Sequence, residues 1–351
     1  MPAPRLVDAH DLLVLDLDGV VYVGPAAVAG AAAALRTVRA DGLAVAFATN
    51  NASRSAEAVA AHLRALGVQA EAAEVATAAQ AAAGLLRDEL APGSSVLVIG
   101  SSALAEEVRA VGLRPVSRAD SGNGAGAGRP EAVVQGYDPG IGWADLAAAA
   151  YAVSAGALWV ATNLDTTLPT AQGLAPGNGA LVGAVAAAVG RPPDRSAGKP
   201  AGDLLRLAAD RVQAHRPLLV GDRLDTDIEA ATRAGWPSLL VLTGVTDAAD
   251  LAAAPPARRP DHVGADLGAL LEPPQMSRWD PASARWLCGP WAGWVEGGAV
   301  HVERLAAGTG RVADWLAGVR AVCAAAWSAS EGAAQVPSGV WEQVGGTRPP
   351  S

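Results

Sequence analysis

Short apolar runs alternate with amphipathic stretches along residues 12–242. The apolar runs, rich in Val and Leu, are Leu12–Leu17, Leu43–Ala48, Val96–Ile99, Ala132–Gln135, Leu158–Ala161, Pro217–Val220 and Ser238–Leu242. Between them lie segments with helical spacing, which include Ala56–Leu66, Ala103–Val111, Asp203–Val212 and Thr226–Ala234. Strands that alternate with helices predict βαβ units and a parallel sheet. Because the runs are apolar throughout, we expect sheets that are covered on both faces.

The pattern changes after about Pro273. Seven of the ten Trp residues lie beyond it, at Trp279, Trp286, Trp291, Trp294, Trp315, Trp327 and Trp341. A strand-like pair around Trp291–Val302, a helix over Val312–Ala326 and a frayed end predict a small α+β domain over residues 275–351. The apolar residues of this helix have the spacing typical of a core. The sequence leaves three roles open for this domain: binding a small molecule, forming a homodimer or packing on the rest of the chain.

Two stretches have the composition of connecting segments. Ser121–Pro130 is rich in Gly and predicts a loop. Ala252–Pro260 is rich in Ala, Pro and Arg, and we expect it to cross the surface.

Composition and charge narrow the class of protein. The 351 residues, 51% of them hydrophobic, indicate a globular chain with more than one domain. A net charge of −9 without a cluster of basic residues argues against a nucleic-acid partner, because neutralisation of phosphates dominates that affinity. The first apolar run is too short and too charged for a signal peptide or a membrane span, so we expect a cytoplasmic protein without a membrane partner. In that compartment Cys288 and Cys323 are expected to be free thiols.

Two acidic residues end the first predicted strand, in Asp16-Leu17-Asp18-Gly19-Val20. Ligands bind at the carboxyl ends of strands in open α/β sheets. Two carboxylates so close together repel each other unless a cation or a proton relieves them. Gly19 permits a sharp exit from the strand and a close approach of backbone N–H groups to an anion. By itself, the motif is equally typical of an acidic turn.

Two further motifs offer groups that bind anions. Thr49-Asn50-Asn51 follows the second predicted strand, where it would also serve as an ordinary helix N-cap, with Ser53 competing for that role. Gly198-Lys199-Pro200 precedes a predicted helix and contains the one lysine of the chain. A lysine at a helix start opposes the helix dipole, which favours an anionic partner over a solvated surface position.

A fourth motif, Gly221-Asp222-Arg223-Leu224-Asp225-Thr226-Asp227, follows the strand Pro217–Val220. Three carboxylates in six residues at a strand end are typical of a site for a hard cation. Acidic residues are also common at helix N-termini, which would account for Asp225 and Asp227 but not for Asp222.

Together the four motifs resemble the haloacid dehalogenase-like hydrolase superfamily over residues 8–272. Thr49 and Lys199 are 150 positions apart, which resembles members with an inserted type IIA cap, as do Thr162-Asn163-Leu164-Asp165 and Pro176-Gly177-Asn178-Gly179. The resemblance implies a Rossmann-like parallel sheet core at 1–79 and 191–272 and an α/β cap at 80–190. In its architecture, a capped phosphatase with an extra C-terminal domain of about this length, the chain resembles actinobacterial glycerol 3-phosphate phosphatases. The segments Asn50-Asn51-Ala52-Ser53-Arg54-Ser55 and Leu242-Thr243-Gly244-Val245 carry the same resemblance, whereas the Trp-rich residues themselves do not.

The resemblance also implies a mechanism. Asp16 would attack phosphorus and form an aspartyl-phosphate, and Asp18 would act as general acid and then general base. Thr49, Lys199 and the backbone N–H groups near Leu17–Gly19 would hold the transferring phosphoryl group.

The metal ligands follow from the same resemblance. Mg²⁺ would bind the carboxylates of Asp16 and Asp222 and the carbonyl of Asp18, and Asp227 would orient this shell. Asp225 has no role that the resemblance assigns.

Five residues are candidates for substrate binding: Gly19, Asn50, Asn51, Asn163 and Asp165. For Asn163 and Asp165, a capped βα turn is as good an interpretation.

The favoured substrate is glycerol 3-phosphate, and 2-phosphoglycolate, sugar phosphates and nucleotide monophosphates remain open. A regulatory module with a vestigial phosphatase core is the alternative from another class. An NAD-dependent enzyme is disfavoured, because the third glycine after Gly177-Asn178-Gly179 comes one residue late, at Gly183.

Overall fold

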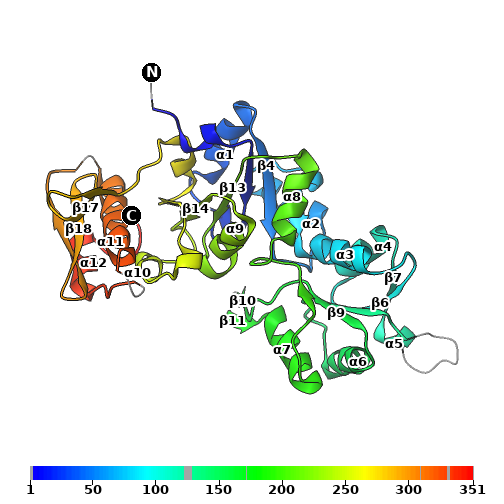
Figure 1. The fold of residues 1–351 in the computed structure, drawn as a ribbon. Coiled ribbons are helices and arrows are strands. Elements are labelled where there is room, and N and C mark those ends of the chain that lie inside the picture. The colour runs from blue at the N-terminus through cyan, green and yellow to red at the C-terminus, as the bar shows by residue number, and fades with distance from the viewer. Residues whose placement is uncertain (1–2, 122–128, 171, 309, 330–332, 351) are drawn as a thin grey trace. The chain divides into compact units, whose positions relative to one another are not determined.

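The computed structural model describes residues 3–121, 129–170, 172–308, 310–329 and 333–350. It divides into two compact units, one made of Met1–Val45 and Ala214–Ser351 and the other of Ala46–Gln213 (Figure 1). Most of the predicted Gly-rich loop, at 122–128, lies outside the described residues. Among the described helices, none combines the length and the apolar character that crossing a membrane requires.

Four parallel strands of the first unit lie in the order β15, β14, β13 and β1. Their bounds are His262–Gly264, Ser238–Val241, Pro217–Gly221 and Leu12–Leu15. Leu12 pairs with Pro217 and Leu15 with Val220, so β1 and β13 end side by side. All residues of β1, β13 and β14 are buried, as their unbroken apolar sequence predicts.

Two short strands, β2 (Tyr22–Val23) and β3 (Ala26–Ala27), also belong to this unit. Its helices and turns before the C-terminal part are η1 (Leu6–Ala9), α1 (Ala31–Ala40), the π-helical turn η3 (Leu224–Ile228), α9 (Glu229–Ala234), α10 (Ala248–Ala252), η4 (Pro256–Arg258) and η5 (Leu267–Leu271). The predicted connecting segment Ala252–Pro260 therefore includes a 3-10 turn. Its Ala254 and Pro260 are buried, so it does not simply cross the surface.

The second unit contains the parallel pair β4 (Ala44–Thr49) and β5 (Val75–Thr77), in which Thr49 pairs with Thr77. It also contains a separate five-stranded parallel sheet in the order β12, β9, β8, β6 and β7. The bounds of these strands are Arg195–Ser196, Leu158–Ala161, Ala132–Gln135, Ser95–Ile99 and Arg114–Val116. The remaining elements are α2 (Ala56–Ala65), η2 (Ala72–Glu74), α3 (Ala78–Glu89), α4 (Ser102–Ala110), α5 (Arg118–Ser121), α6 (Trp143–Ser154), β10 (Thr167–Thr170), β11 (Gly173–Pro176), α7 (Asn178–Val189) and α8 (Asp203–Val212).

The Trp-rich C-terminal part forms an antiparallel sheet and two helices within the first unit. The sheet is β16 (Arg278–Asp280), β17 (Arg285–Cys288), β18 (Trp291–Glu296) and β19 (Ala299–Arg304), followed by α11 (Arg311–Trp327) and α12 (Ser338–Val344). Helix α11 lies closely on β18, because a Cβ at Gly293 would be 2.5 Å from the carbonyl oxygen of Ala321. Cys288 and Cys323 are buried free thiols, as predicted.

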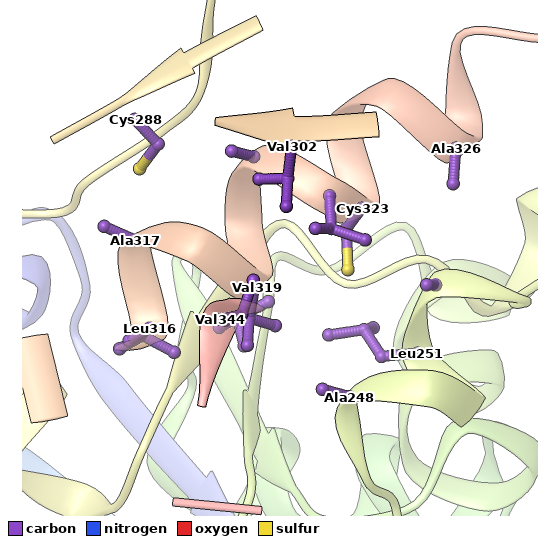
Figure 2. Packing of buried hydrophobic residues seen from close by; sticks show 14 of the residues in the cluster. Ala248, Leu251, Cys288, Val302, Leu316, Ala317, Val319, Cys323, Ala326 and Val344 are labelled. Atoms are coloured by element: carbon purple, nitrogen blue, oxygen red, sulfur yellow. The ribbon is translucent and has the colours of Figure 1, made fainter. Parts of the chain in front are cut away.

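The prediction of a frayed end is wrong. Val340, Trp341 and Val344 of α12 are buried. They join one hydrophobic cluster that runs from α11 to Leu240 and Leu251 (Figure 2). The C-terminal part thus shares its core with the strand and helix that follow the candidate metal loop.

This shared core predicts a large effect for Trp315→Ala. Trp315 is 2% exposed, and its Nε1 donates to the carbonyl of Gly346 at 2.9 Å. Removing a buried Trp side chain costs about 3–5 kcal/mol of the free energy of unfolding. We expect a lower midpoint in thermal unfolding followed by circular dichroism. Trp143→Ala is the matched control, because Trp143 is 79% exposed and a surface change is worth about 0.5 kcal/mol or less. Equal midpoints for both variants would contradict the shared core.

Candidate active site

Three carboxylates meet in the first unit, where β1 and β13 end. Ligand oxygens of Asp16, Asp222 and Asp227 all lie within 4.8 Å of one another. Asp222 and Asp227 are buried, and Asp16 is half-buried. The backbone N–H of Asp16 donates to Val220 at 2.8 Å, which extends the pairing of the strands by one residue. The convergence follows from the parallel register, since both strands end at the same edge of the sheet.

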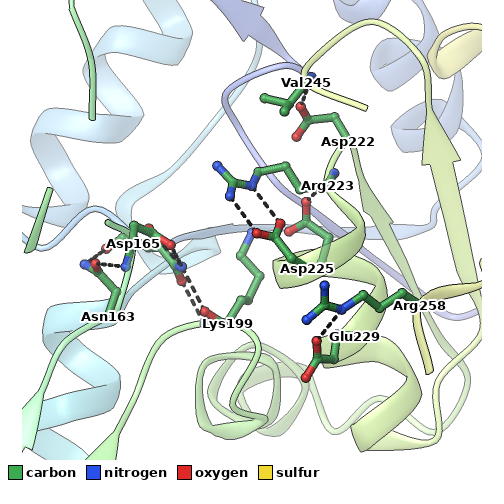
Figure 3. A network of polar contacts seen from close by, with 11 residues as sticks. Asn163, Asp165, Lys199, Asp222, Arg223, Asp225, Glu229, Val245 and Arg258 are labelled. Carbon is green, nitrogen blue, oxygen red and sulfur yellow. Dashed lines mark hydrogen bonds and ion pairs between the residues drawn. The ribbon is translucent and has the colours of Figure 1, made fainter. Parts of the chain in front are cut away.

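Asp222 is held by the loop after β14. The backbone N–H of Val245 donates to its Oδ2 at 2.6 Å (Figure 3). A Cβ would lie 2.4 Å from this oxygen if built on Gly19, and 1.9 Å from it if built on Gly244. Thr243 Oγ1 donates to the carbonyl of Gly19. The two glycines therefore leave the space that the Asp222 carboxylate fills.

Asp227 lies in the π-helical turn η3, a type of irregularity that is frequent at functional sites. Its Oδ2 accepts from the backbone N–H of Arg223 at 3.1 Å. A Cβ at Gly221 would be 2.2 Å from the Cβ of Asp227, so this turn also needs a glycine. Of the three acidic residues of the motif, Asp225 is the one that does not converge. It forms an ion pair with Arg223 at 2.9 Å and its side chain is 49% exposed.

The turn after β1 shapes the remainder of the Asp16 motif. Gly19 has a φ of 81°, in the left-handed region that glycine tolerates best, and its N–H donates to Tyr22 at 2.7 Å. The side chain of Asp18 is exposed. The segment from Asp16 to Val20, predicted as a strand end, is therefore a tight turn. The carboxylate of Asp16 lies in the cluster with Asp222 and Asp227, and that of Asp18 is exposed to solvent.

In the second unit, Asn50 connects three predicted site residues. Its Nδ2 donates to both carboxylate oxygens of Asp165, at 3.2 and 3.4 Å, and to the carbonyl of Lys199 at 3.0 Å. Its Oδ1 accepts from the N–H of Lys199 at 2.8 Å. Asn163 Nδ2 donates to the carbonyl of Asn50 at 2.7 Å, and Asn163 Oδ1 accepts from the N–H of Asp165. Both ends of the Asn50 amide are thus used within the protein.

The same unit places Lys199 and Thr49 in the interior. Lys199 is 3% exposed, and its Nζ donates to the carbonyl of Ala48 at 3.1 Å. A solvated surface lysine, one interpretation of the sequence, is therefore wrong. Thr49 Oγ1 accepts from the N–H of Asn51 at 3.1 Å. The N-cap of α2 is Ser55, so neither Thr49 nor Ser53 caps that helix.

Asn51 and the Pro176–Gly179 motif stabilise loops. Asn51 Oδ1 accepts from the N–H and the hydroxyl of Ser53, at 2.8 and 3.0 Å. Asn178, which the sequence placed in this motif without a role of its own, donates to the carbonyl of Asn163 at 2.8 Å. A Cβ at Gly179 would be 2.2 Å from a backbone oxygen of the loop before β10. The motif therefore supports the loop that presents Asn163.

A contact from the C-terminus reaches the loop that holds Asp222. Arg348 Nη1 donates to the carbonyl of Gly244 at 2.6 Å, and Nη2 donates to that of Val245 at 2.8 Å. The N–H of Ala248 donates to the carbonyl of Thr347 at 3.0 Å. Nothing in the sequence indicated this contact, because Arg348 lies more than 100 residues beyond the motif.

We therefore expect Arg348→Ala to weaken metal binding without unfolding the protein. Three hydrogen bonds from the guanidinium are lost, to the carbonyls of Gly244, Val245 and Thr246. At an exposed site they are worth about 1–2 kcal/mol together, or about a 5–30-fold change in an equilibrium. The concentration of Mg²⁺ at half-maximal activity should rise by this factor, and Arg348→Lys should restore part of it. An unchanged Mg²⁺ dependence would show that the contact does not position Asp222.

Comparison with known proteins identifies the family. A family model described as haloacid dehalogenase-like hydrolase matches residues 13–114, and a related model matches residues 196–270. The D-glycerol 3-phosphate phosphatase of Mycobacterium tuberculosis is 48% identical over 333 residues, which cover 92% of this chain and 88% of that protein. The chain belongs to the haloacid dehalogenase-like hydrolase family. This confirms the family that the four motifs predicted.

Solved structures agree with this membership. The glycerol phosphate phosphatase from Mycobacterium tuberculosis, crystallised in complex with magnesium, has a TM-score of 0.84 at 45% identity, over 98% of this chain and 99% of that one. The p-nitrophenyl phosphatase from Archaeoglobus fulgidus has a TM-score of 0.67 at 28% identity, over 76% of this chain and 98% of that one. The predicted α/β fold with a parallel sheet is confirmed.

Proposed function

We propose that this haloacid dehalogenase-like hydrolase removes phosphate from glycerol 3-phosphate in a Mg²⁺-dependent reaction. The observation that carries the proposal is the convergence of Asp16, Asp222 and Asp227 at the ends of two parallel strands. The choice of substrate is supported by the 48% identity to a D-glycerol 3-phosphate phosphatase over nearly the whole chain.

The donor set suits Mg²⁺. All three side chains offer carboxylate oxygens, which hard cations prefer, and Mg²⁺ usually takes one or two carboxylates and keeps several waters. Asp16 and Asp222 would hold the ion together with the carbonyl of Asp18, and Asp227 would orient the shell. When bound, the cation would stabilise negative charge on a phosphoryl oxygen.

The proposed chemistry uses Asp16 and Asp18. A carboxylate oxygen of Asp16 attacks phosphorus, the bond from phosphorus to the glycerol oxygen breaks, and Asp18 donates a proton to that oxygen. Asp18 then accepts a proton from water, whose oxygen attacks phosphorus and releases Asp16 as a carboxylate. The exposed side chain of Asp18 is accessible to a leaving group and to water. General acid–base help of this kind contributes about 10²–10⁴-fold.

Thr49 and Lys199 are proposed to hold the phosphoryl group, together with backbone N–H groups near Leu17–Gly19. Burial of the one lysine supports a role for Lys199, because a buried ammonium group is stabilised by a negative group, which a bound phosphoryl group would supply. Substrate contacts of Gly19, Asn51, Asn163 and Asp165 stay predictions. For Asn50, the hydrogen bonds favour positioning Lys199 over touching the substrate.

The division into domains also stays a proposal. A core at 1–79 and 191–272 with a cap at 80–190 is supported by the separate five-stranded sheet, because β6, β7, β8 and β9 lie within 80–190. The fifth strand, β12 (Arg195–Ser196), lies just beyond the proposed boundary. The segment 275–351 is proposed as a small domain that shares its core with the preceding strands. Cytoplasmic location and a homodimer stay predictions.

A substrate screen tests the proposed function. The purified full-length chain is assayed for phosphate release with Mg²⁺ on glycerol 3-phosphate, 2-phosphoglycolate, sugar phosphates and nucleotide monophosphates. We expect the highest kcat/KM for glycerol 3-phosphate and loss of activity in excess chelator. A higher kcat/KM for another ester would refute the substrate, and no release from any ester would favour a regulatory module.

A further inference from the structure

A cavity of about 410 Å³ lies in the first unit, away from the carboxylate cluster. It is bounded by α11, by the segments before β15 and β16, and by Trp286 of β17. Trp286 and Trp327 give it aromatic walls. Its volume falls within the range of small-molecule sites, about 300–1,000 Å³, and none of its lining residues belongs to the proposed active site.

Arg320 of α11 places a positive charge in this wall. Its guanidinium donates to the carbonyl of Val263 and to the side chain of Gln275, both of which are neutral. Its buried Nε has no hydrogen-bond partner among the described residues. Burial lowers the pKa of Arg320. The neighbouring Cys288 opposes this shift, and Glu272, which forms no ion pair with Arg320 among the described residues, opposes it less. The charge of Arg320 is thus poorly compensated.

The neighbouring thiol does not supply the missing negative charge. Burial raises the pKa of Cys288 above its usual value, although the positive charge of Arg320 opposes the shift. Cys288 is therefore a neutral thiol near pH 7. A buried cation without an anionic partner is costly, so a negative group bound here would be stabilised.

The guanidinium of Arg259 adds a second positive charge to the lining of the cavity. Arg259 lies 5.4 Å from the ring centroid of Trp327, and it donates to the carbonyls of Ala254 and Trp327. One carboxylate, Asp261, also lines the cavity, but its Oδ2 accepts two hydrogen bonds from Ser238, at 2.9 and 3.0 Å. The lining thus carries two guanidinium groups and one carboxylate that is already satisfied by β14.

We infer that this cavity binds a small organic carboxylate with an apolar body. The carboxylate would pair with Arg320, whose planar guanidinium matches carboxylate geometry. The apolar body would lie against Trp286 and Trp327, where aromatic surface offers large contact area. Trp286 Nε1, buried without a partner among the described residues, is a further donor in this wall. Glycerol 3-phosphate lacks an apolar body, so it is not the ligand expected here.

Binding of 3-phenylpropanoate to the full-length protein tests the inference, with neutral 3-phenylpropanamide as the matched ligand. Binding of each ligand is measured by titration calorimetry and by the change in tryptophan fluorescence. We expect a Kd below about 1 mM for the carboxylate. The amide should bind at least about tenfold more weakly, because a charge-assisted hydrogen bond is lost. No binding of the carboxylate, or equal binding of both ligands, would overturn the inference.

Three variants of α11 locate the site. Arg320→Gln removes the charge, and Ala324→Phe fills the cavity without a change of charge. Both should lose at least about tenfold in affinity for 3-phenylpropanoate. Arg311→Gln, at an exposed position of the same helix, should keep it. Thermal unfolding checks each variant. If Arg320→Gln fails to fold, Ala324→Phe still tests whether the ligand binds in this cavity. Unchanged affinity in that variant would show that the ligand binds elsewhere.

Discussion

Asp16→Asn is expected to abolish turnover of glycerol 3-phosphate and to leave the protein folded. The side chain keeps its size at the end of β1, but it loses the charge that is proposed to attack phosphorus and to bind Mg²⁺. Removal of a nucleophile lowers kcat by at least about 10⁴-fold, and the loss of a metal ligand adds to this effect. Steady-state phosphate release and circular dichroism measure the two parts of the prediction.

Covalent chemistry can be separated from metal binding by acid quenching. With substrate labelled in its phosphate, wild-type protein should carry label that hydroxylamine removes, as expected for an acyl phosphate, and Asp16→Asn should carry none. Asp225→Asn is the matched control, because Asp225 lies in the same acidic motif but forms an exposed ion pair with Arg223. Burial opposes a low pKa of Asp225, and hydrogen bonds from Arg223 outweigh it, so Asp225 is a carboxylate near pH 7. Turnover in Asp16→Asn close to that of Asp225→Asn would refute the covalent mechanism.

Hydrophobic patterning predicted the central strands well because these strands are apolar from end to end. Leu12–Leu17, Ala132–Gln135 and Leu158–Ala161 correspond to β1, β8 and β9 within two residues. The pattern did not predict short strands at sheet edges. An example is β7, whose sequence is Arg-Pro-Val over Arg114–Val116. Three residues with one charge and one proline carry too little pattern to be recognised, and their pairing with β6 decides their conformation.

The acidic residues of the site were predictable because they occur in motifs that follow two strands, and neighbouring parallel strands end at the same edge of a sheet. The residues that hold these carboxylates in place were not predictable. Val245 contributes a backbone N–H, which any residue supplies, and Gly244 contributes only the absence of a Cβ. Arg348 acts over a separation of 104 residues on the carbonyl of Gly244. Such contacts depend on the fold of the whole unit, and the local sequence does not encode them.

These supports predict that Gly244→Ala will damage metal binding as severely as changing a ligand. An added Cβ would lie 1.9 Å from Asp222 Oδ2 and 2.5 Å from its Cγ, so the carboxylate must move. The carboxylate cannot move toward Gly19, because it already fills the space that a Cβ would occupy on that residue. Movement of the carboxylate also breaks its hydrogen bond from the N–H of Val245. We expect the Mg²⁺ concentration at half-maximal activity to rise by about 100-fold or more, the upper range for residues that orient metal ligands.

Titration of activity with Mg²⁺ measures this effect, and excess Mg²⁺ should restore part of the rate. Gly84→Ala is the matched control, since Gly84 lies inside α3 with nothing within 4 Å of an added Cβ. Replacing a helical Gly by Ala stabilises the helix by about 1 kcal/mol, and the Mg²⁺ dependence should not change. Wild-type Mg²⁺ dependence in Gly244→Ala would mean that Asp222 tolerates displacement, and Asp222 would then not be a ligand of the catalytic metal.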